Sequence, residues 1–570
     1  MSEPQRGIFG IDLGTTYSVV GYIDDAGRAA VTRNNYGDDT TPSVVYFEND
    51  ENVVVGKPAK EAAGVEPDQV VSLIKREMGD AEWRRTFFGH DYSPPAISAI
   101  ILKALAQDAQ VDTGRTVADV VITVPAYFGL LEKDATRKAG EIAGLNVIGI
   151  VPEPVAAALQ YGVSGGADGT VFLVYDLGGG TFDVSLIRLT PDTVEVLIVD
   201  GNHKLGGADW DQRLFDYIVD ETVAQSGDDS LRDDEAQLQE LRTLAEQTKQ
   251  SLSATESKTV IVRTTGTAAK MTVTRADFER MTADLLAQTI EITHRVLDQA
   301  EEKFPGVTRQ LGDVLLVGGS SKMPAVKEAL EREFGWSPKL AEPDLAVAKG
   351  AALYAAGQTV RIVEPDPDGT SAADGAEPAA GRGLPGPVNE QKLEAVAEET
   401  GIAPEDLERL AQRTVVNVLP KSIGVKLVDT EKPGWESDPT SAYYIQHLVD
   451  AQTQLPFEAE PFVAGTVAAN QRAIQIEIWE QSGARPGREI SENHPLDAGG
   501  QITGLEPHHL PAGSPVHLDF YVDAEGTVHL KAVEPQSNQE LKLEVRISVL
   551  SEEQVAQEKE VVQTGLTVST

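Results

Sequence analysis

Two acidic residues in this chain each stand between an apolar run and a glycine turn. Asp12 is followed by the letters LGTT, and Asp176 is followed by LGGGT. Glycine weakens a strand, so three in a row favour a tight turn whose bare N–H groups approach a bulky anion such as phosphate. Paired carboxylates beside phosphates suit Mg²⁺, which keeps most of its waters and needs only one or two acidic contacts. Taken singly, each Asp is more often an ordinary turn or capping residue.

A third glycine turn strengthens this interpretation. The stretch VGGSSKMP at 317–324 also follows an apolar strand. Three glycine turns at strand ends within one domain predict a nucleotide site, and Thr15, Thr16 and Thr181 add hydroxyl donors beside two of them. The chain holds no G-x-x-x-x-G-K-S/T motif, which excludes a P-loop NTPase as the main interpretation.

Hydrophobic periodicity indicates the elements that position these turns. Up to Gly357, short runs rich in Val, Ile, Leu and Phe alternate with helical patterns, which predicts an α/β domain with open sheets. The runs 8–13 with 18–23 and 171–176 with 183–189 predict two similar hairpins, as in an internal duplication with two phosphate loops facing each other across a cleft. From Thr414 the period changes to two, which predicts an antiparallel β-sandwich.

Changes of composition along the chain predict five parts. Residues 364–389 are rich in Pro, Gly, Ala and Asp and contain no aromatic residue, so they favour a flexible linker. Ser551 is a good N-cap for a last helix, with acidic residues in its first turn. The expected parts are a nucleotide-binding domain at 1–358, a flexible linker at 359–389, a short helical insertion at 390–413, a β-sandwich at 414–550 and one helix within 551–570.

Composition also narrows the class of protein. At 570 residues the chain exceeds what one hydrophobic core supports, so we expect two or three domains. The net charge of −42 argues against binding to nucleic acid or to an anionic membrane. Cysteine is absent, which excludes disulfides, thiolate metal sites and a cysteine nucleophile. The sequence contains neither a long apolar segment nor a leader-like start, so we expect a soluble, cytoplasmic protein.

Longer motifs carry a family resemblance. GIDLGTTYSVVGY, VVITVPAYF, VPEPVAAALQYG, VYDLGGGTFDVS, KLGGADWDQRL, LVGGSSKMP and EPDLAVAKGAALYAA together resemble the ATPase domain of the seventy-kilodalton heat-shock (DnaK-like) chaperones. NVLPKSIGV and FYVDAEGTVHLKAV are similar to that family's peptide-binding domain. The resemblance implies an actin-like α/β ATPase domain, with two lobes that each have subdomains, followed by an antiparallel β-sandwich. It also implies ATP or ADP and Mg²⁺ as cofactors.

The resemblance assigns roles to residues of the first domain. Lys75 would orient the attacking water, Asp12 and Asp176 would hold Mg²⁺ through water, and Pro125 would be a switch that links nucleotide state to domain arrangement. Lys133 stands where the family usually has the arginine that works with this switch. The residues implied in catalysis are Lys75, Asp12, Glu153, Asp176 and Thr181, with Asp183 nearby. Those implied in nucleotide binding are Gly14, Thr15, Thr16, Tyr17, Gly178, Gly179, Gly180, Glu246, Lys249, Ser253, Gly318, Gly319, Ser320, Lys322 and Asp344.

The sandwich and the segments on either side of it depart from the family pattern. The family's short interdomain linker is replaced by the insertion at 360–413, and its helical lid is reduced to one helix or lost. By resemblance a peptide groove would involve Val425, Val428, Val467, Ile474 and Ile476. The alternative is that these apolar residues belong to an ordinary sandwich core, which the residues alone would favour.

Four functions remain open from the sequence. The leading one is an ATP-dependent chaperone-like protein that hydrolyses ATP to ADP and phosphate and binds unfolded or extended polypeptides, with J-domain and nucleotide-exchange co-chaperones as partners. It would act in protein folding and the stress response. The alternatives are a kinase-like enzyme for small molecules or a protein that binds one dedicated partner, and an actin-like scaffold. The sandwich argues against kinases and filaments, which have no reason to append an apolar groove.

Overall fold

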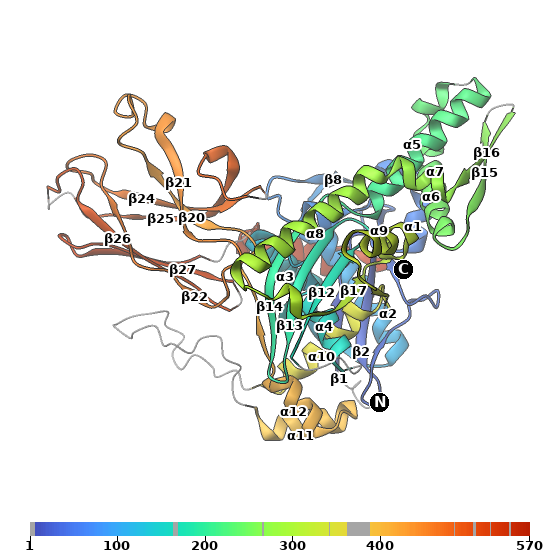
Figure 1. The fold of residues 1–570 in the computed structure, drawn as a ribbon, viewed down its shortest axis with the longest axis horizontal. Helices are drawn as coiled ribbons and strands as arrows, with labels where there is room; N and C mark the ends of the chain where they lie inside the picture. The colour runs from blue at the N-terminus through green and yellow to red at the C-terminus, as the bar shows by residue number, and fades with distance from the viewer. Residues whose placement is uncertain are drawn as a thin grey trace.

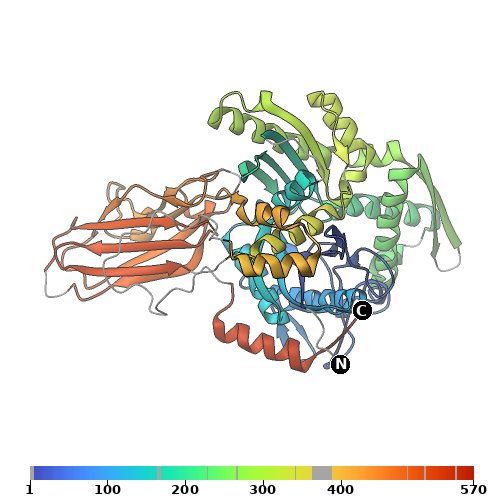
Figure 2. The same cartoon turned by 90° about the horizontal axis from the view of Figure 1, so that it is seen from below.

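A computed structural model describes residues 6–163, 169–227, 229–264, 267–340, 342–361, 388–483, 485–505, 509–524, 526–545 and 549–570. Two α/β lobes stand together, and a β-sandwich extends from them to one side (Figures 1 and 2). We call residues 6–163 lobe I and residues 170–340 lobe II. This arrangement confirms the predicted fold class of α/β lobes followed by an antiparallel sandwich.

The central sheet of lobe I carries the first glycine turn. Its strand order is β11-β10-β1-β2-β3, with β4 paired to β2. β1 pairs in parallel with β10 and antiparallel with β2, so Asp12 lies at the end of a strand where the hairpin turns. The strands are β1 (Arg6–Asp12), β2 (Tyr17–Ile23), β3 (Ala29–Val31), β4 (Thr41–Pro42), β10 (Thr116–Val124) and β11 (Asn146–Pro152).

The central sheet of lobe II repeats this arrangement around the second turn. Its order is β18-β17-β12-β13-β14-β19. β12 pairs antiparallel with β13 and in parallel with β17, as β1 does with β2 and β10. The two hairpins therefore present their glycine turns at equivalent places. The strands are β12 (Thr170–Leu177), β13 (Phe182–Leu189), β14 (Thr193–Asn202), β17 (Leu311–Val317), β18 (Lys339–Leu340) and β19 (Thr414–Val416).

Two helices fill the space between these sheets. α4 and α10 pack against each other, and their residues Val155, Leu159, Val347 and Leu353 share one core with strands of both lobes. Burial of these faces joins the lobes at the base of the cleft. The helices of this region are α1 (Lys57–Ala62), α2 (Pro94–Thr113), α3 (Leu130–Ala143), α4 (Glu153–Val163), α5 (Gly207–Ser226), α6 (Glu235–Ala254), α7 (Arg275–Met281), α8 (Ala283–Lys303), α9 (Pro324–Phe334) and α10 (Ala346–Thr359).

Smaller elements complete the lobes. The hairpin of β15 and β16, with parts of α5, α6 and α7, forms an arm at the end of lobe II opposite the sandwich (Figure 1). The remaining strands are β5 (Val45–Phe47), β6 (Asn52–Val55), β7 (Val70–Val71), β8 (Arg85–Phe87), β9 (His90–Tyr92), β15 (Ser257–Thr264) and β16 (Thr267–Thr274). Two short 3₁₀ helices, η2 (Ile74–Glu77) and η5 (Gly319–Lys322), border the cleft.

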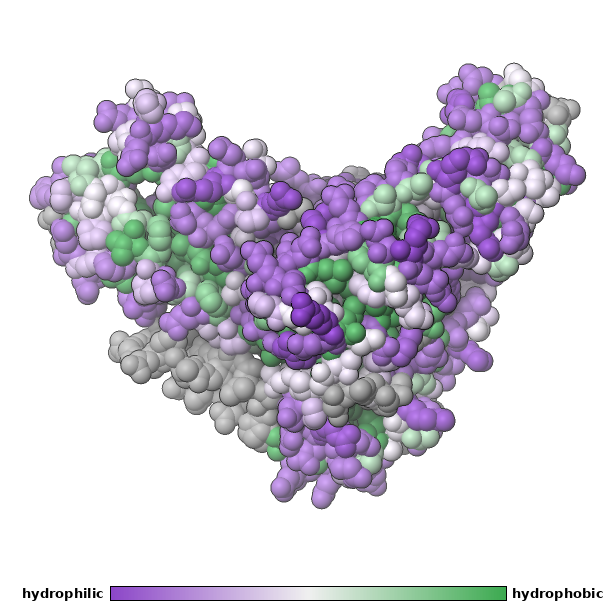
Figure 3. Space-filling model, viewed as in Figure 1, coloured by the Kyte–Doolittle hydropathy of each residue, from purple (hydrophilic) through white to green (hydrophobic). Residues whose placement is uncertain are grey.

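The sandwich consists of two antiparallel sheets. Their orders are β21-β20-β24-β25 and β22-β26-β27-β28, with β23 paired to β26. Alternate residues of β26 (Val516, Leu518, Phe520 and Val522) are buried, as the period of two predicts. On the face of the sandwich seen in Figure 3, a hydrophobic area lies where Figure 1, in the same view, shows β20, β24 and β25. The strands are β20 (Ile423–Val428), β21 (Tyr443–Val449), β22 (Phe457–Glu458), β23 (Phe462–Gly465), β24 (Ile474–Gln481), β25 (Asn493–Ile502), β26 (Pro515–Val522), β27 (Val528–Glu534) and β28 (Gln539–Val545).

The helical insertion packs onto the lobes. It forms α11 (Glu390–Thr400) and α12 (Pro404–Gln412), and α12 lies against α10. Ile402 and Leu407 are buried in the core shared by both lobes. β19 then extends the lobe II sheet, pairing in parallel with β14. Most of the predicted flexible linker, residues 362–387, lies outside the described residues.

The two described residues that flank 362–387 are paired with each other. Arg361 and Val388 form an antiparallel bridge, and the N–H of Asn389 donates to the carbonyl of Val360 at 3.0 Å. We expect that replacing 362–387 by a four-residue Gly-Ser turn leaves the fold intact, because the ends already meet. Each halving of a closed loop removes roughly 0.6 kcal/mol of closure entropy, so thermal unfolding should move slightly upward. A scrambled 362–387 of equal length is the control, and a lowered unfolding temperature in the short variant would contradict the prediction.

The last part of the chain leaves the sandwich and returns to lobe I. α13 (Glu552–Glu560) begins at the expected cap, where the Ser551 hydroxyl accepts from the N–H of Gln554. A π-helical turn (Val561–Gly565) comes next, and β29 (Thr567–Ser569) pairs in parallel with β6. Lys103 of α2 donates to the carbonyl of Val562 at 2.7 Å. Figure 2 shows α13 running along lobe I rather than over the sandwich.

Candidate nucleotide site

A cleft of about 560 Å³ lies between the lobes, a size typical of small-molecule sites. Every residue that the sequence places in catalysis or nucleotide binding lines it, except Gly180, which adjoins it. These lining residues are Asp12, Gly14, Thr15, Thr16, Tyr17, Lys75, Glu153, Asp176, Gly178, Gly179, Thr181, Glu246, Lys249, Ser253, Gly318, Gly319, Ser320, Lys322 and Asp344.

The two hairpin turns, one from each lobe, are in direct contact beside the cleft. A Cβ atom on Gly179 would lie 1.9 Å from the Thr16 hydroxyl oxygen, and one on Gly180 would lie 2.2 Å from Cγ2 of Thr15. No other residue type fits at either position without moving the opposite turn. The glycine run is therefore explained by close approach of the two lobes, and it also leaves the backbone of the turn accessible from the cleft.

Acidic side chains dominate the floor of the cleft. Asp12, Glu153, Asp176 and Asp183 gather there, and Lys75 lies among them with its Nζ 2.6 Å from Glu153 Oε1. Burial, and next the charge of Glu153, raises the pKa of Asp12 to about 7 and that of Asp183 to about 8. Burial and the same neighbour also raise the pKa of Asp176. One lysine does not offset four carboxylates, so the site favours a further cation.

The donor set fits a hydrated Mg²⁺. Within the described parts of the chain, no three His, Cys, Asp or Glu groups lie close enough to hold a metal ion directly. Mg²⁺ keeps several waters and takes one or two carboxylates, often with phosphate oxygens. Asp12 and Asp176, at the ends of two strands that face the same cleft, match this requirement through water.

The opposite side of the cleft has the chemistry of a nucleoside pocket. α6 contributes Glu246, Lys249 and Ser253, and η5 contributes Ser320 and Lys322. Here Lys322 forms an ion pair with Asp344. The hydroxyl of Tyr17 in lobe I donates to Glu246 Oε1 in lobe II at 3.0 Å, which ties the two rims of the cleft together.

Sequence reasoning missed some residues of this site. Asp211 lines the cleft and lies 2.7 Å from Lys249 Nζ. Arg76 and Asp209 form an ion pair of 2.6 Å behind the glycine turn. Asp209 and Asp211 belong to the motif KLGGADWDQRL, but nothing in their spacing alone distinguishes them from helix-capping and surface acids.

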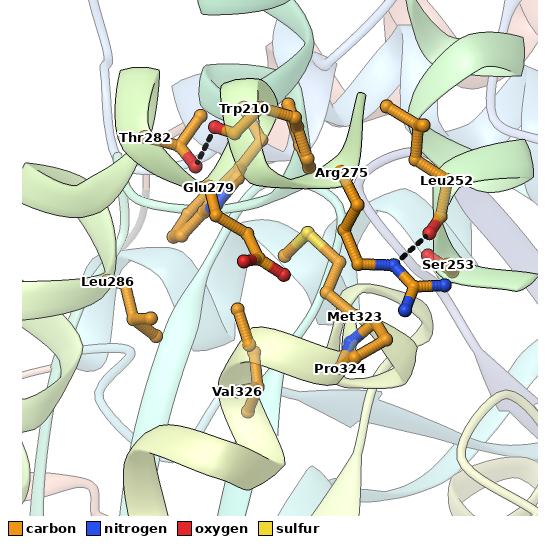
Figure 4. Close-up of a pocket in the computed structure, with 12 residues that line it drawn as sticks. Trp210, Leu252, Ser253, Arg275, Glu279, Thr282, Leu286, Met323, Pro324 and Val326 are labelled. Carbon is orange, nitrogen blue, oxygen red and sulfur yellow. Dashed lines mark hydrogen bonds between the residues drawn. The ribbon is translucent and has the colours of Figure 1, made fainter. Parts of the chain in front are cut away.

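A second, much smaller cavity adjoins the nucleoside side of the cleft (Figure 4). It lies among Trp210, Leu252, Phe278 and Met323, and Arg275 Nε donates to the carbonyl of Leu252 at 2.8 Å beside it. Its volume of about 20 Å³ is no larger than a water molecule requires. This cavity therefore offers no room for a second ligand in the present arrangement.

The two predicted switch residues lie outside the cleft. Pro125 is buried directly after β10, in a turn whose Tyr127 N–H donates to Asp183 Oδ1 at 3.2 Å. Lys133 lies on α3 where the sandwich meets lobe I. Burial lowers the pKa of Lys133, and the charges of Glu480 and Glu132 partly oppose this shift.

Of the five predicted groove residues, two are buried in the sandwich core and three are half-buried. Val425 is 1% exposed and Ile476 is 6% exposed, and both belong to the sandwich core. The others, Val428, Val467 and Ile474, are half-buried. Val463 on β23, which sequence reasoning did not select, is 52% exposed.

Comparisons with known proteins match this geometry. The family model described as Hsp70 protein matches residues 8–361. The protein named Chaperone protein DnaK from Halobacterium salinarum, in strain R1 and in strain NRC-1, is 35% identical over 563 residues, covering 97% of this chain and 77% of the relative. The chain therefore belongs to the Hsp70 family of chaperones. Among its described helices, none is long and apolar enough to cross a membrane.

Proposed function

We propose that this chain binds Mg-ATP in the cleft between the lobes and hydrolyses it slowly to ADP and phosphate. The observation that carries the proposal is the buried group of four carboxylates and one lysine, which lies between two glycine turns in contact with each other. Such a floor repels a bare anion but suits phosphates that arrive with a divalent cation.

Each part of the cleft has a role in this proposal. The turns at 12–16 and 178–181 bind the phosphates through backbone N–H groups and through the hydroxyls of Thr15, Thr16 and Thr181. Asp12 and Asp176 hold Mg²⁺ through water, and when bound the ion neutralises charge on the phosphates. Lys75, which Glu153 holds at 2.6 Å, orients the attacking water. Phosphoryl transfer needs mainly positioning and charge stabilisation, which these groups supply.

Release of inorganic phosphate from ATP tests this function. Purified protein should release phosphate slowly in excess Mg²⁺ without any acceptor, and EDTA should stop the release. A kinase-like enzyme would instead transfer the phosphoryl group to an added small molecule. No phosphate release in Mg²⁺, with a metal-dependent transfer to an acceptor, would replace the proposed function by that alternative.

We further propose that the sandwich binds extended apolar segments of client polypeptides, with J-domain and nucleotide-exchange proteins as partners. Family membership supports this, as do the half-buried and exposed apolar side chains around β23 and β24. An extended peptide adds backbone hydrogen bonds to apolar side-chain pockets, so unfolded segments are favoured over folded surfaces.

Peptide binding is expected to weaken at least about tenfold in Ile474→Asp. A carboxylate placed in a half-buried apolar position is desolvated when a peptide covers it, which costs more than about 1.4 kcal/mol. Fluorescence anisotropy with a labelled leucine-rich peptide measures the effect. Val111→Asp, at an exposed position of α2, is the control for the added charge. If the wild type does not bind, or Ile474→Asp binds equally well, the sandwich serves one dedicated folded partner instead.

A further inference from the structure

All three glycine carbonyls of the turn at 178–181 are held from outside the cleft. The carbonyl of Gly178 accepts from the N–H of Gly207 at 3.0 Å, and that of Gly179 accepts from the N–H of Ala208 at 2.7 Å. The carbonyl of Gly180 accepts from Arg76 Nε at 2.9 Å. In a trans peptide the N–H points opposite to the carbonyl. The N–H groups of the next three residues are therefore turned away from α5 and Arg76, toward the cleft.

The third of these contacts differs in kind from the first two. Gly207 and Ala208 are backbone donors of α5, within the same lobe as the turn. Arg76 is a side chain of lobe I, so it reaches the turn from the other lobe, on the side away from the cleft. Its Nη2 lies 2.6 Å from Asp209 Oδ2, and the same carboxylate oxygen accepts from the N–H of Gly206 at 2.8 Å. The guanidinium thus joins lobe I to the turn and to the first turn of α5, using its rigid fork of donors.

The orientation of the peptide between Gly180 and Thr181 depends on Arg76. Gly206 lies so close to the turn that a Cβ there would be 2.6 Å from the backbone of Gly180. This contact sets the distance between the turn and α5. The hydrogen bonds that the carbonyls of Gly178 and Gly179 accept from α5 fix the planes of the two peptides that contain those carbonyls. For the peptide between Gly180 and Thr181, the side chain of Arg76 is the anchor seen among the described residues.

Arg76 also adjoins the residue proposed to orient water. Lys75 and Arg76 are consecutive residues of η2, where side chains leave the axis about 120° apart. η2 starts from Leu73, which has φ 58, a left-handed conformation that fixes the direction of the helix. One short helix therefore directs Lys75 to Glu153 in the cleft and Arg76 to the back of the glycine turn.

We propose that Arg76 is a positioning residue that aims the N–H of Thr181 at the terminal phosphate and makes this aim depend on closure of the two lobes. The proposal rests on the ATP hydrolysis proposed above. A nucleotide without a terminal phosphate makes no use of this donor, so Arg76 discriminates ATP from ADP rather than holding nucleotides in general.

Arg76→Ala is expected to lower kcat roughly 10- to 100-fold, because a donor aimed at the transition state is misaligned rather than removed. The affinity for ADP should stay within about threefold, while the affinity for ADP with beryllium fluoride should fall toward that for ADP. Millimolar guanidinium should restore part of the lost turnover in Arg76→Ala but none in Lys75→Ala. Arg84→Ala removes an exposed arginine of the same segment and serves as the control.

The outcomes separate this proposal from the proposed function. The role proposed for Arg76 is contradicted if Arg76→Ala keeps the wild-type turnover and still prefers ADP with beryllium fluoride over ADP alone. It is also contradicted if the variant binds both ligands more weakly by the same factor, because that result indicates a general structural role. If the wild type hydrolyses no ATP, the proposed function fails, and the preference measured by binding still decides the role of Arg76. Arg76→Lys, which keeps the charge without the fork, gives the same test if the alanine variant does not fold.

Discussion

Replacing Lys75 by alanine is expected to lower ATP turnover by at least about 100-fold while ADP still binds. The side chain of Lys75 is 4% exposed, and its Nζ lies 2.6 Å from Glu153. Its removal leaves four carboxylates at the floor of the cleft without their one lysine and leaves the attacking water without its proposed guide. The nucleotide contacts proposed for α6 and η5 do not involve Lys75, so nucleotide binding should depend on it much less.

Single-turnover hydrolysis and calorimetry of ADP binding measure the two effects separately. Lys327→Ala, which removes an exposed lysine of α9, controls for loss of one positive charge. Wild-type turnover in Lys75→Ala would show that another group orients the water. Loss of ADP binding in that variant would show instead that Lys75 holds the cleft floor together.

Local sequence predicted the glycine turns well because strand, turn and strand succeed one another along the chain. Asp12 and Asp176 end strands that their own neighbours specify, so their common cleft could be expected from two similar hairpins. Lys75 has no such signal, since its sequence is that of an exposed helical lysine. Only the family resemblance selected it, and the structure buries it beside Glu153.

Contacts between distant segments could not be predicted in this way. Arg76 donates a hydrogen bond to Gly180 more than a hundred positions along the chain, and β29 pairs with β6 across almost the whole sequence. A three-residue strand has too little pattern of its own to indicate a partner. For the same reason, the helices at 390–413 could be predicted as helices, but not their packing against α10.

The junction between the sandwich and lobe I contains a buried group of charges. Glu480, on β24, is 0% exposed, and it accepts a hydrogen bond from the N–H of Leu130 in α3 at 3.3 Å. Lys421 lies 3.5 Å from Glu480 and 3.2 Å from Glu132 of α3. A Cβ atom on Gly129 would lie 2.6 Å from the Glu480 carboxylate, so the glycine allows this close approach.

The charges at this junction depend on one another. Burial raises the pKa of Glu480, but Lys421 and His494 outweigh burial and lower it to about 2. Burial lowers the pKa of Lys421, but Glu132 and Glu480 outweigh it and raise the pKa above its ordinary value. Both groups therefore stay charged at neutral pH, and each makes burial of the other tolerable. Separating the sandwich from lobe I would expose them to water instead.

Glu480→Ala is therefore expected to favour separation of the sandwich from lobe I. Removing Glu480 leaves the buried Lys421 with Glu132 as its remaining acidic neighbour at the junction, and losing one partner of a buried charge group costs up to about 3–5 kcal/mol while the junction stays closed. Lys421 escapes this cost when the junction opens. Small-angle scattering should show a larger radius of gyration, and cleavage within 414–420 by a protease should become faster. Glu477→Ala is the matched control, because Glu477 on the same strand pairs with Lys426 at 2.5 Å within the sandwich.

A second substitution distinguishes a buried unpaired charge from simple loss of a contact. In Glu480→Ala with Lys421→Leu, the lysine that the first change leaves short of a partner is gone, and an apolar side chain fills part of its place. Glu132 also loses Lys421, but its side chain is 19% exposed, so water can solvate it. Because replacing both partners of a buried pair is often nearly neutral, the double variant should close again and resemble the wild type in scattering and proteolysis. If the double variant opens further than Glu480→Ala, the two side chains contribute independently, and the junction depends on their separate contacts rather than on balanced charge.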